Sequence, residues 1–208
     1  MNLLAHLHLS TGQPVAMAAG NLLADFMRRF GATDIDPEFA AGVRLHRAID
    51  VFTDSHPLIR AARRLIAPPR NRLAGIIIDI ALDHQLSRHW NAHAALPLTT
   101  FVRARLAEIQ AYLAAHDTPL NWVIRRAIRD DWLLSYATLA GLDLTFERVA
   151  SRAPVAAALR GATADIARHD AHFQQLFHAF YPALRAHAAQ THADTGLAHA
   201  YASEDLSE

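Results

Sequence analysis

Apolar side chains recur every three to four residues along most of the chain, the spacing that places them on one face of an α-helix. The first such stretch covers about residues 15–31 and ends at Gly31, a residue type that often caps helices. A second, over about 36–54, opens with an acidic residue and a first-turn proline. A third covers about 55–69, and two consecutive prolines end it.

The next segment, about residues 70–90, is apolar on nearly all sides of the helix that its length predicts. A helix without a polar face is normally buried, so we expect this one at the centre of the molecule. Further helices are predicted over about 98–116, from 120 onward, and over about 130–140, 144–151 and 162–187. The sequence therefore predicts an all-α, single-domain helical bundle over residues 1–189, followed by a disordered polar tail over 190–208.

The composition agrees with a packed helical protein and limits the cellular location and the ligands that we expect for it. Apolar residues make up 52% of the chain and charged residues 19%, and Ala and Leu dominate the helical stretches. The absence of cysteine excludes disulfides and thiolate nucleophiles. We find neither a secretory signal nor an apolar run of the ~20 residues that cross a bilayer, so a cytoplasmic protein without a membrane anchor is expected. The formal net charge of zero argues against general nucleic-acid binding.

Acidic and histidine side chains occupy helix faces that should be apolar. His46 and Asp50 lie four residues apart, and so do Asp79 and Asp83, so each pair shares one helix face at a separation of roughly 6 Å. Asp25 lies among apolar residues of the first predicted helix. An unpaired buried carboxylate costs several kcal/mol, so each of these groups needs an ion pair or a metal. The chain has 20 arginines and no lysine, and an arginine ion pair is an open alternative at any single position.

A divalent metal accounts for the whole set more simply than separate ion pairs do. Carboxylate and imidazole ligands without thiolate suit Mn²⁺, Fe²⁺ or Mg²⁺ better than a structural zinc. Other catalytic patterns fail, because no glycine-rich phosphate loop follows a predicted strand and no serine lies in a nucleophile-elbow pattern. The aromatic residues at helical spacing are most simply core residues: Trp122, Trp132, Tyr136, Phe173, Phe177, Phe180 and Tyr181.

Four blocks of sequence resemble, in the right order, the acyl carrier protein phosphodiesterase family. They are MNLLAHLHL at 1–9, GNLLADF at 20–26, GVRLHRAIDVFTD at 42–54 and DIALDHQLSRHW at 79–90, and weaker similarity extends the resemblance over roughly 1–189. The resemblance implies a helical fold related to the HD phosphohydrolases, although the adjacent pair here reads Asp83-His84 rather than His-Asp. It also implies hydrolysis of the phosphodiester that joins 4′-phosphopantetheine to a serine of acyl carrier protein.

Mn²⁺ is the metal that the resemblance implies. Its expected ligands are Asp25, His46 and Asp83, with Asp50 or His84 completing the shell. We expect His6 to act as the general acid or to orient a ligand, and Asp79 to orient the nucleophile or a ligand histidine. Arg47 is expected to hold the phosphate, and a salt bridge to a neighbouring Asp is its alternative role.

Acyl carrier protein is acidic, so an enzyme acting on it needs a basic docking surface. Five arginines without an intervening acid precede the central helix: Arg60, Arg63, Arg64, Arg70 and Arg72. We expect them to bind the carrier protein, Arg60, Arg63 and Arg64 foremost, and a plain solvated face is the alternative. A second basic group at 125–129 is offset by the acids at 130–131. Two other functions stay open: an HD-like phosphohydrolase of a nucleotide or other small phosphoester, and a non-catalytic, metal-free helical module that binds a carrier protein.

Overall fold

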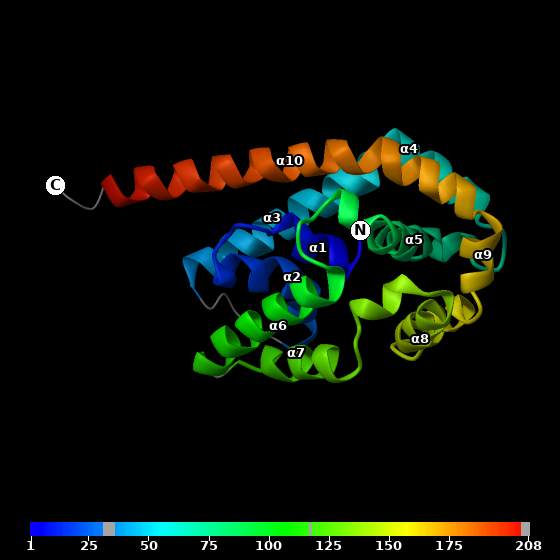
Figure 1. Ribbon diagram of the computed structural model, residues 1–208, viewed down its shortest axis with the longest axis horizontal. Coiled ribbons are helices and arrows are strands. Elements are labelled where there is room, and N and C mark those ends of the chain that lie inside the picture. The colour runs from blue at the N-terminus through cyan, green and yellow to red at the C-terminus, as the bar shows by residue number, and fades with distance from the viewer. Residues whose placement is uncertain (31–35, 117, 205–208) are drawn as a thin grey trace.

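The computed structural model describes residues 1–30, 36–116 and 118–204 of the 208-residue chain, and side chains over 1–27, 36–116 and 118–193. Within these ranges the chain forms helices and turns without any strand, which confirms the predicted all-α fold (Figure 1). The α-helices are α1 (Leu3–Leu9), α2 (Val15–Phe30), α3 (Pro37–Ser55), α4 (Pro57–Ala62), α5 (Ala74–Arg88), α6 (Leu98–Ala115), α7 (Leu120–Arg129), α8 (Leu139–Ala150), α9 (Thr163–Arg168) and α10 (Asp170–Glu204). Short 3₁₀ turns join them: η1 (Arg63–Leu65), η2 (Asn71–Leu73), η3 (Trp90–Ala92), η4 (Leu134–Ala137) and η5 (Pro154–Leu159).

The central helix α5 is buried, as its all-round apolar sequence predicts. Ile77, Ile78 and Ile80 have no exposed surface. Figure 1 shows α1 and α5 enclosed between α10 on one side and α6, α7 and α8 on the other. Burial of each such side chain stabilises the fold by roughly 1.5–3 kcal/mol relative to an exposed position, so α5 anchors the whole bundle.

Helices α2 and α3 pack at very short range because each places a glycine against the backbone of the other. A Cβ atom on Gly20 would lie 2.1 Å from the Phe39 carbonyl oxygen, and one on Gly42 would lie 2.0 Å from the Met17 carbonyl oxygen. No side chain fits at either position, so both must be glycine. This close approach brings the polar residues of α2 within reach of those of α3.

The segment predicted as a helix around 130–140 is instead a turn. Asp131 has a φ of 46°, a left-handed conformation that interrupts the helical path after α7. The η4 turn follows, and Thr138 then caps the N-terminus of α8, because its side chain accepts a hydrogen bond from the Gly141 N–H. The predicted helix over 162–187 likewise divides into α9 and α10.

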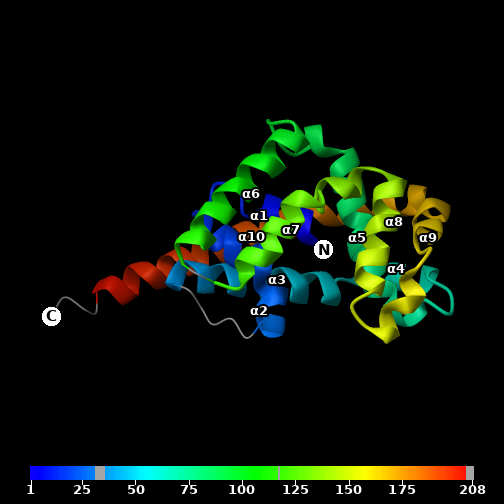
Figure 2. The same cartoon turned by 90° about the horizontal axis from the view of Figure 1, so that it is seen from below.

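Helix α10 lies along one edge of the molecule, and its C-terminal part extends beyond the other helices in both views (Figures 1 and 2). Its backbone is helical to Glu204, and the alanine-rich sequence of this part suits a helix. Residues 205–208 and Gly31, the predicted cap of α2, lie outside the described residues. No helix searched in the described part of the chain is long and apolar enough to cross a bilayer.

Six of the seven aromatic residues predicted for the core are buried, four of them on the N-terminal half of α10. Trp122 is the exception, with 53% of its surface exposed. It lies on α7, beside a groove described below.

Candidate metal centre

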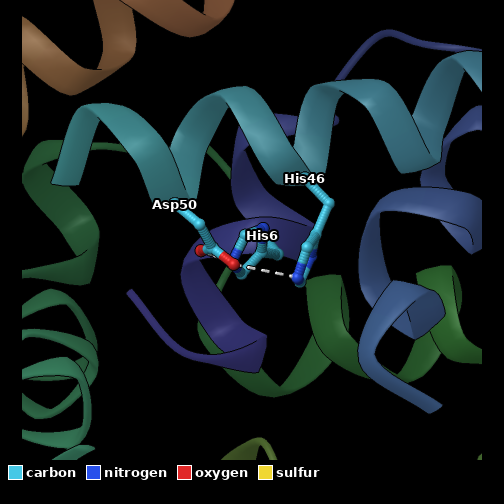
Figure 3. A group of neighbouring side chains, drawn as sticks. All are labelled: His6, His46 and Asp50. Atoms are coloured by element: carbon cyan, nitrogen blue, oxygen red, sulfur yellow. Dashed lines mark ion pairs between the residues drawn. The ribbon is translucent and has the colours of Figure 1, made fainter. Parts of the chain in front are cut away.

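Two helices bring three candidate metal ligands together (Figure 3). His46 and Asp50 project from one face of α3, as their spacing predicts, and His6 reaches them from α1. His6 Nε2 lies 3.3 Å from Asp50 Oδ1, and His46 Nε2 lies 3.1 Å from Asp50 Oδ2. One ligand atom from each residue can be chosen so that all lie within 4.8 Å of one another, a spacing compatible with one shared ion.

Asn21 of α2 sets the tautomer and orientation of both histidines. Its backbone carbonyl lies 2.8 Å from His46 Nδ1, and a carbonyl only accepts, so this nitrogen carries a hydrogen. Its side-chain nitrogen donates to the His6 carbonyl and to Ser10 Oγ, so its Oδ1 accepts from His6 Nδ1 at 2.9 Å. Each neutral histidine therefore presents the lone pair of Nε2 to Asp50. Such partners behind the imidazole are typical of metal-ligating histidines.

Neighbouring carboxylates control the charge of this cluster. Burial disfavours the charged form of His46, but Asp25, whose Oδ1 is 3.3 Å from His46 Nε2, and Asp50 raise the pKa of His46 to about 9. Burial also opposes ionisation of Asp50, yet His46 and His6 hold the pKa of Asp50 well below its usual value. A cation at His46 Nε2 could take the place of that proton. This nitrogen is buried and faces the carboxylates of Asp25 and Asp50, so the ligand set fits a metal ion.

Asp25 connects the cluster to an open pocket of about 240 Å³. Its side chain is 81% exposed, and the hydrogen-bonding contact with His46 lowers the pKa of the Asp25 carboxyl. The pocket lies between α1, α2, α5, η4 and α8, and its walls include Asp25, Asp79, Trp132, Arg148 and Arg152. A ligand in this pocket therefore reaches the edge of the metal-ligand cluster.

Asp79 and Asp83 on α5 both contact the N-terminal end of the chain. Asp83 is fully buried and accepts hydrogen bonds from the N–H groups of Asn2 at 3.1 Å and Leu4 at 2.8 Å. Burial raises the pKa of Asp83 to about 7, although the N-terminal amine and these N–H groups act in the opposite direction. Asp79 lines the pocket and accepts from the Met1 amine at 2.9 Å. The Asp83 carboxylate thus binds N–H groups at the start of α1, the helix that carries His6, and it lies outside the group formed by His6, His46 and Asp50.

His84 also lies outside the group formed by His6, His46 and Asp50. Its Nδ1 lies 2.6 Å from the Tyr136 carbonyl oxygen, so the imidazole is tied to η4. Adjacent helical residues point about 100° apart, and this rotation separates His84 from the face of Asp83. The same rotation separates Arg47 from His46, and Arg47 is exposed on α3. The described residues include no ion pair to Arg47, so the alternative role, a salt bridge to a neighbouring Asp, has no partner among them.

The arginines expected to dock a carrier protein are dispersed over α4 and η1. Arg60 and Arg64 are exposed. Arg63 is half-buried and forms an ion pair with Asp54 at the end of α3. Its charge is therefore already partnered within the protein.

Three contributions to the site are missing from the sequence-based prediction. Asn21 precedes Asp25 by four residues, the same spacing used for the other pairs, so its place on that helix face could have been recognised. Helix α1 has only 7 residues, too few to show a helical repeat. Arg148 carried no signal, because arginine on an amphipathic helix is most simply a solvated residue, and Arg152 follows that helix in a segment of only weak family similarity.

Comparison with known proteins gives a consistent result. The family model described as acyl carrier protein phosphodiesterase matches residues 1–184. A protein of that name from Photorhabdus laumondii is 38% identical over 185 residues, covering 88% of this chain and 92% of the relative. One from Yersinia enterocolitica is 37% identical over 203 residues, covering 90% and 97%. One from Serratia proteamaculans is 36% identical over 183 residues, covering 88% and 94%. No solved structure matches, so the relation to the HD fold stays a prediction.

Proposed function

Because this chain belongs to the acyl carrier protein phosphodiesterase family, we propose that it hydrolyses the phosphodiester between phosphopantetheine and a serine of acyl carrier protein. The products are apo-acyl carrier protein and free phosphopantetheine. The main structural support is the convergence of two imidazole Nε2 atoms and a carboxylate at the edge of an open pocket. Phosphodiester hydrolysis needs an activated water and a partner for the phosphate charge, and this arrangement offers groups for both.

His6, His46 and Asp50 are the proposed ligands of a divalent cation, and Asp25 is the proposed further ligand at the pocket wall. When bound, the cation would polarise a phosphoryl oxygen and lower the pKa of a coordinated water. Mg²⁺ prefers an all-oxygen shell, whereas two imidazoles with carboxylates suit Mn²⁺ or Fe²⁺. Mn²⁺ is therefore the proposed metal.

His6 is proposed as a ligand rather than as the general acid. Its Nδ1 hydrogen is donated to Asn21 and its Nε2 faces Asp50, so it has no proton directed toward a leaving serine oxygen. Asp79 is the proposed residue for orienting the attacking water. Its carboxylate lines the pocket, and its side chain is 30% exposed.

Incubation of metal-depleted protein with holo-acyl carrier protein tests the proposal. Intact-mass measurement should show loss of the phosphopantetheine arm when Mn²⁺ is added, less loss with Zn²⁺, and none with a chelator. Full activity after exhaustive metal removal would contradict the metal-dependent mechanism. An unchanged carrier protein under every metal condition would contradict the proposed substrate.

The exposed arginines between α4 and α5 are proposed to dock the acidic carrier protein. Arg60, Arg64 and Arg72 are exposed, whereas Arg63 and Arg70 form ion pairs with Asp54 and Asp165. Charges at the edge of a protein interface mainly accelerate association of the two proteins, and salt screens them over a Debye length of about 10 Å at 0.1 M. Arg64→Glu should therefore lower kcat/KM for holo-acyl carrier protein most strongly at low salt. Arg103→Glu on α6 is the matched control, and equal losses in both variants would assign docking elsewhere.

A further inference from the structure

The pocket beside Asp25 has walls of opposite charge. Asp25 and Asp79 contribute carboxylates from α2 and α5, while Arg148 and Arg152 contribute guanidinium groups from α8 and the turn after it. An anion cannot bind next to the carboxylates without a cation between them. The arginine wall is the part of the pocket where the protein itself can neutralise a negative ligand.

Arg148 is held in place by groups that leave its charge uncompensated. It donates a hydrogen bond to Thr145 Oγ1 at 2.8 Å and a longer one to Ser135 Oγ at 3.4 Å, and its guanidinium carbon lies 5.2 Å from the centroid of the Trp132 ring. These partners are neutral. No carboxylate lies within ion-pair distance of Arg148 in the described part of the chain, and burial lowers the pKa of this guanidinium. A half-buried cation fixed without a counter-ion is suited to receive an anionic ligand.

A second pocket of about 110 Å³ continues this surface, and the two share Phe26, Trp132, Arg148 and Arg152. The Arg152 guanidinium carbon lies 5.5 Å from the Phe26 ring centroid, so a second cation is also stacked on an aromatic face. The aromatic surface continues to Trp122, whose exposure was not expected from the sequence. The two pockets together form a groove with cations at its centre and room for a longer organic chain on either side.

We propose that Arg148, with Arg152 beside it, binds the phosphate of the phosphopantetheine group and so positions the phosphodiester against the Asp25 edge of the metal-ligand cluster. The proposal rests on the proposed function for the identity of the substrate. A planar guanidinium can donate two parallel hydrogen bonds to two phosphate oxygens, and the hydrogen bonds of Arg148 to Ser135 and Thr145 both use the same terminal nitrogen, Nη2. Arg148 would then be a substrate-binding residue on α8, a helix for which the sequence analysis predicts no functional residue.

Binding of two soluble ligands separates this role from a structural one. Phosphopantetheine and pantetheine differ by the phosphate alone, and their affinities can be measured by calorimetry without turnover. Arg148→Ala should weaken phosphopantetheine binding about 10- to 100-fold, the usual loss for a hydrogen bond to a charged group, and leave pantetheine binding unchanged. Arg148→Lys keeps the positive charge but not the planar guanidinium, and its loss of phosphopantetheine affinity should be smaller. Arg160→Ala is the control, because Arg160 is exposed and pairs with Glu147 away from the pocket.

Unchanged phosphopantetheine affinity in a folded Arg148→Ala protein would overturn the proposal, as would an equal loss of affinity for both ligands. If Arg148→Ala does not fold, Arg148→Lys and Arg152→Ala decide the matter by the same two affinities. Turnover of holo-acyl carrier protein is measured separately. A wild-type enzyme that removes the arm while Arg148→Ala binds phosphopantetheine normally would retain the proposed function and eliminate this inference. A wild-type protein that binds phosphopantetheine through Arg148 without cleaving the carrier protein would support the role of Arg148 and contradict the proposed function.

Discussion

Helices α3 and α5 each carry two ionisable residues four positions apart, and α1 contacts both pairs. At α3, the side chains of His46 and Asp50 contact the side chain of His6, and the Nε2 atoms of both histidines face the Asp50 carboxylate. At α5, Asp83 meets backbone N–H groups of α1, and both of its oxygens accept hydrogen bonds. The same spacing thus places side chains that can bind a cation on α3, whereas on α5 it places a carboxylate whose oxygens already accept hydrogen bonds from α1.

This difference shows that spacing places two groups on one face but does not decide what they bind. A carboxylate whose lone pairs are already used by helix N–H groups contributes to stability, because it satisfies donors that would otherwise be buried without partners. A cluster with converging lone pairs costs stability until a cation binds. The two regions should therefore respond in opposite ways to the same substitution, and four measurements test this.

The largest expected difference comes from the same isosteric change at the two sites. Asp50→Asn removes the carboxylate that faces both histidines and should lower phosphodiesterase activity at least about 10³-fold, equivalent to roughly 4 kcal/mol, without loss of helical circular dichroism. Asp83→Asn keeps an acceptor for α1 and should stay within about threefold of wild type. The measurements are the steady-state rate of holo-acyl carrier protein hydrolysis and the bound metal content of both variants. Comparable inactivation with loss of metal in Asp83→Asn would restore Asp83 as a ligand.

Truncation of the Asp83 side chain should mainly affect folding. Asp83→Ala leaves the N–H groups of Asn2 and Leu4 without their acceptor and should lower the free energy of unfolding by about 2–4 kcal/mol. Urea denaturation followed by circular dichroism measures this loss, and Asp50→Ala serves as the matched comparison on α3. A larger loss of stability in Asp50→Ala than in Asp83→Ala would reverse the assignment of the two regions.

Asn21 should influence metal affinity through its hydrogen bonds to the two ligand histidines. Asn21→Ala removes the side-chain acceptor that orients His6 but keeps the backbone carbonyl that orients His46. Loss of such a supporting partner typically weakens metal binding 10- to 100-fold, about 1.4–2.7 kcal/mol. Titration of metal-depleted protein with Mn²⁺ measures the affinity, and Ser10→Ala, which removes only the neighbouring hydroxyl, is the control. Equal Mn²⁺ affinity in wild type and Asn21→Ala would exclude this supporting role.

A further prediction concerns the pH dependence of stability. The pKa of Asp83 is about 7 in the folded protein and near 3.9 in an unfolded chain, so the folded state binds this proton more tightly. The stabilising contribution is complete below about pH 4 and is lost as the pH rises through about 7, with a slope of at most about 1.4 kcal/mol per pH unit. The free energy of unfolding of wild type relative to Asp83→Asn should fall between pH 4 and pH 7 and level off above that range. A pH-independent difference would mean that Asp83 titrates normally in the folded protein.

Much of the fold could be predicted because it depends on local sequence. The apolar repeat located α2, α3, α6 and the start of α10, and the all-round apolar stretch identified α5 as the central helix. The prediction failed where local sequence is weak: at α1, which is too short to show a repeat, and around Asp131, whose left-handed backbone ends a pattern that looks helical. The i, i+4 spacing also correctly placed His46 and Asp50 on one face.

By itself, the sequence determined the helical class, the buried central helix and the set of acids and histidines from which a site could be built. Only the tertiary structure decided which of them meet. Gly20 and Gly42 let α2 and α3 approach until Asn21 reaches His46, and the position of α1 directs His6 toward Asp50 while its N-terminal N–H groups occupy Asp83. Helical periodicity fixes the direction of a side chain around its own axis, whereas the partner it finds depends on the distance and rotation between helices. Those quantities are set by packing among residues far apart in the chain.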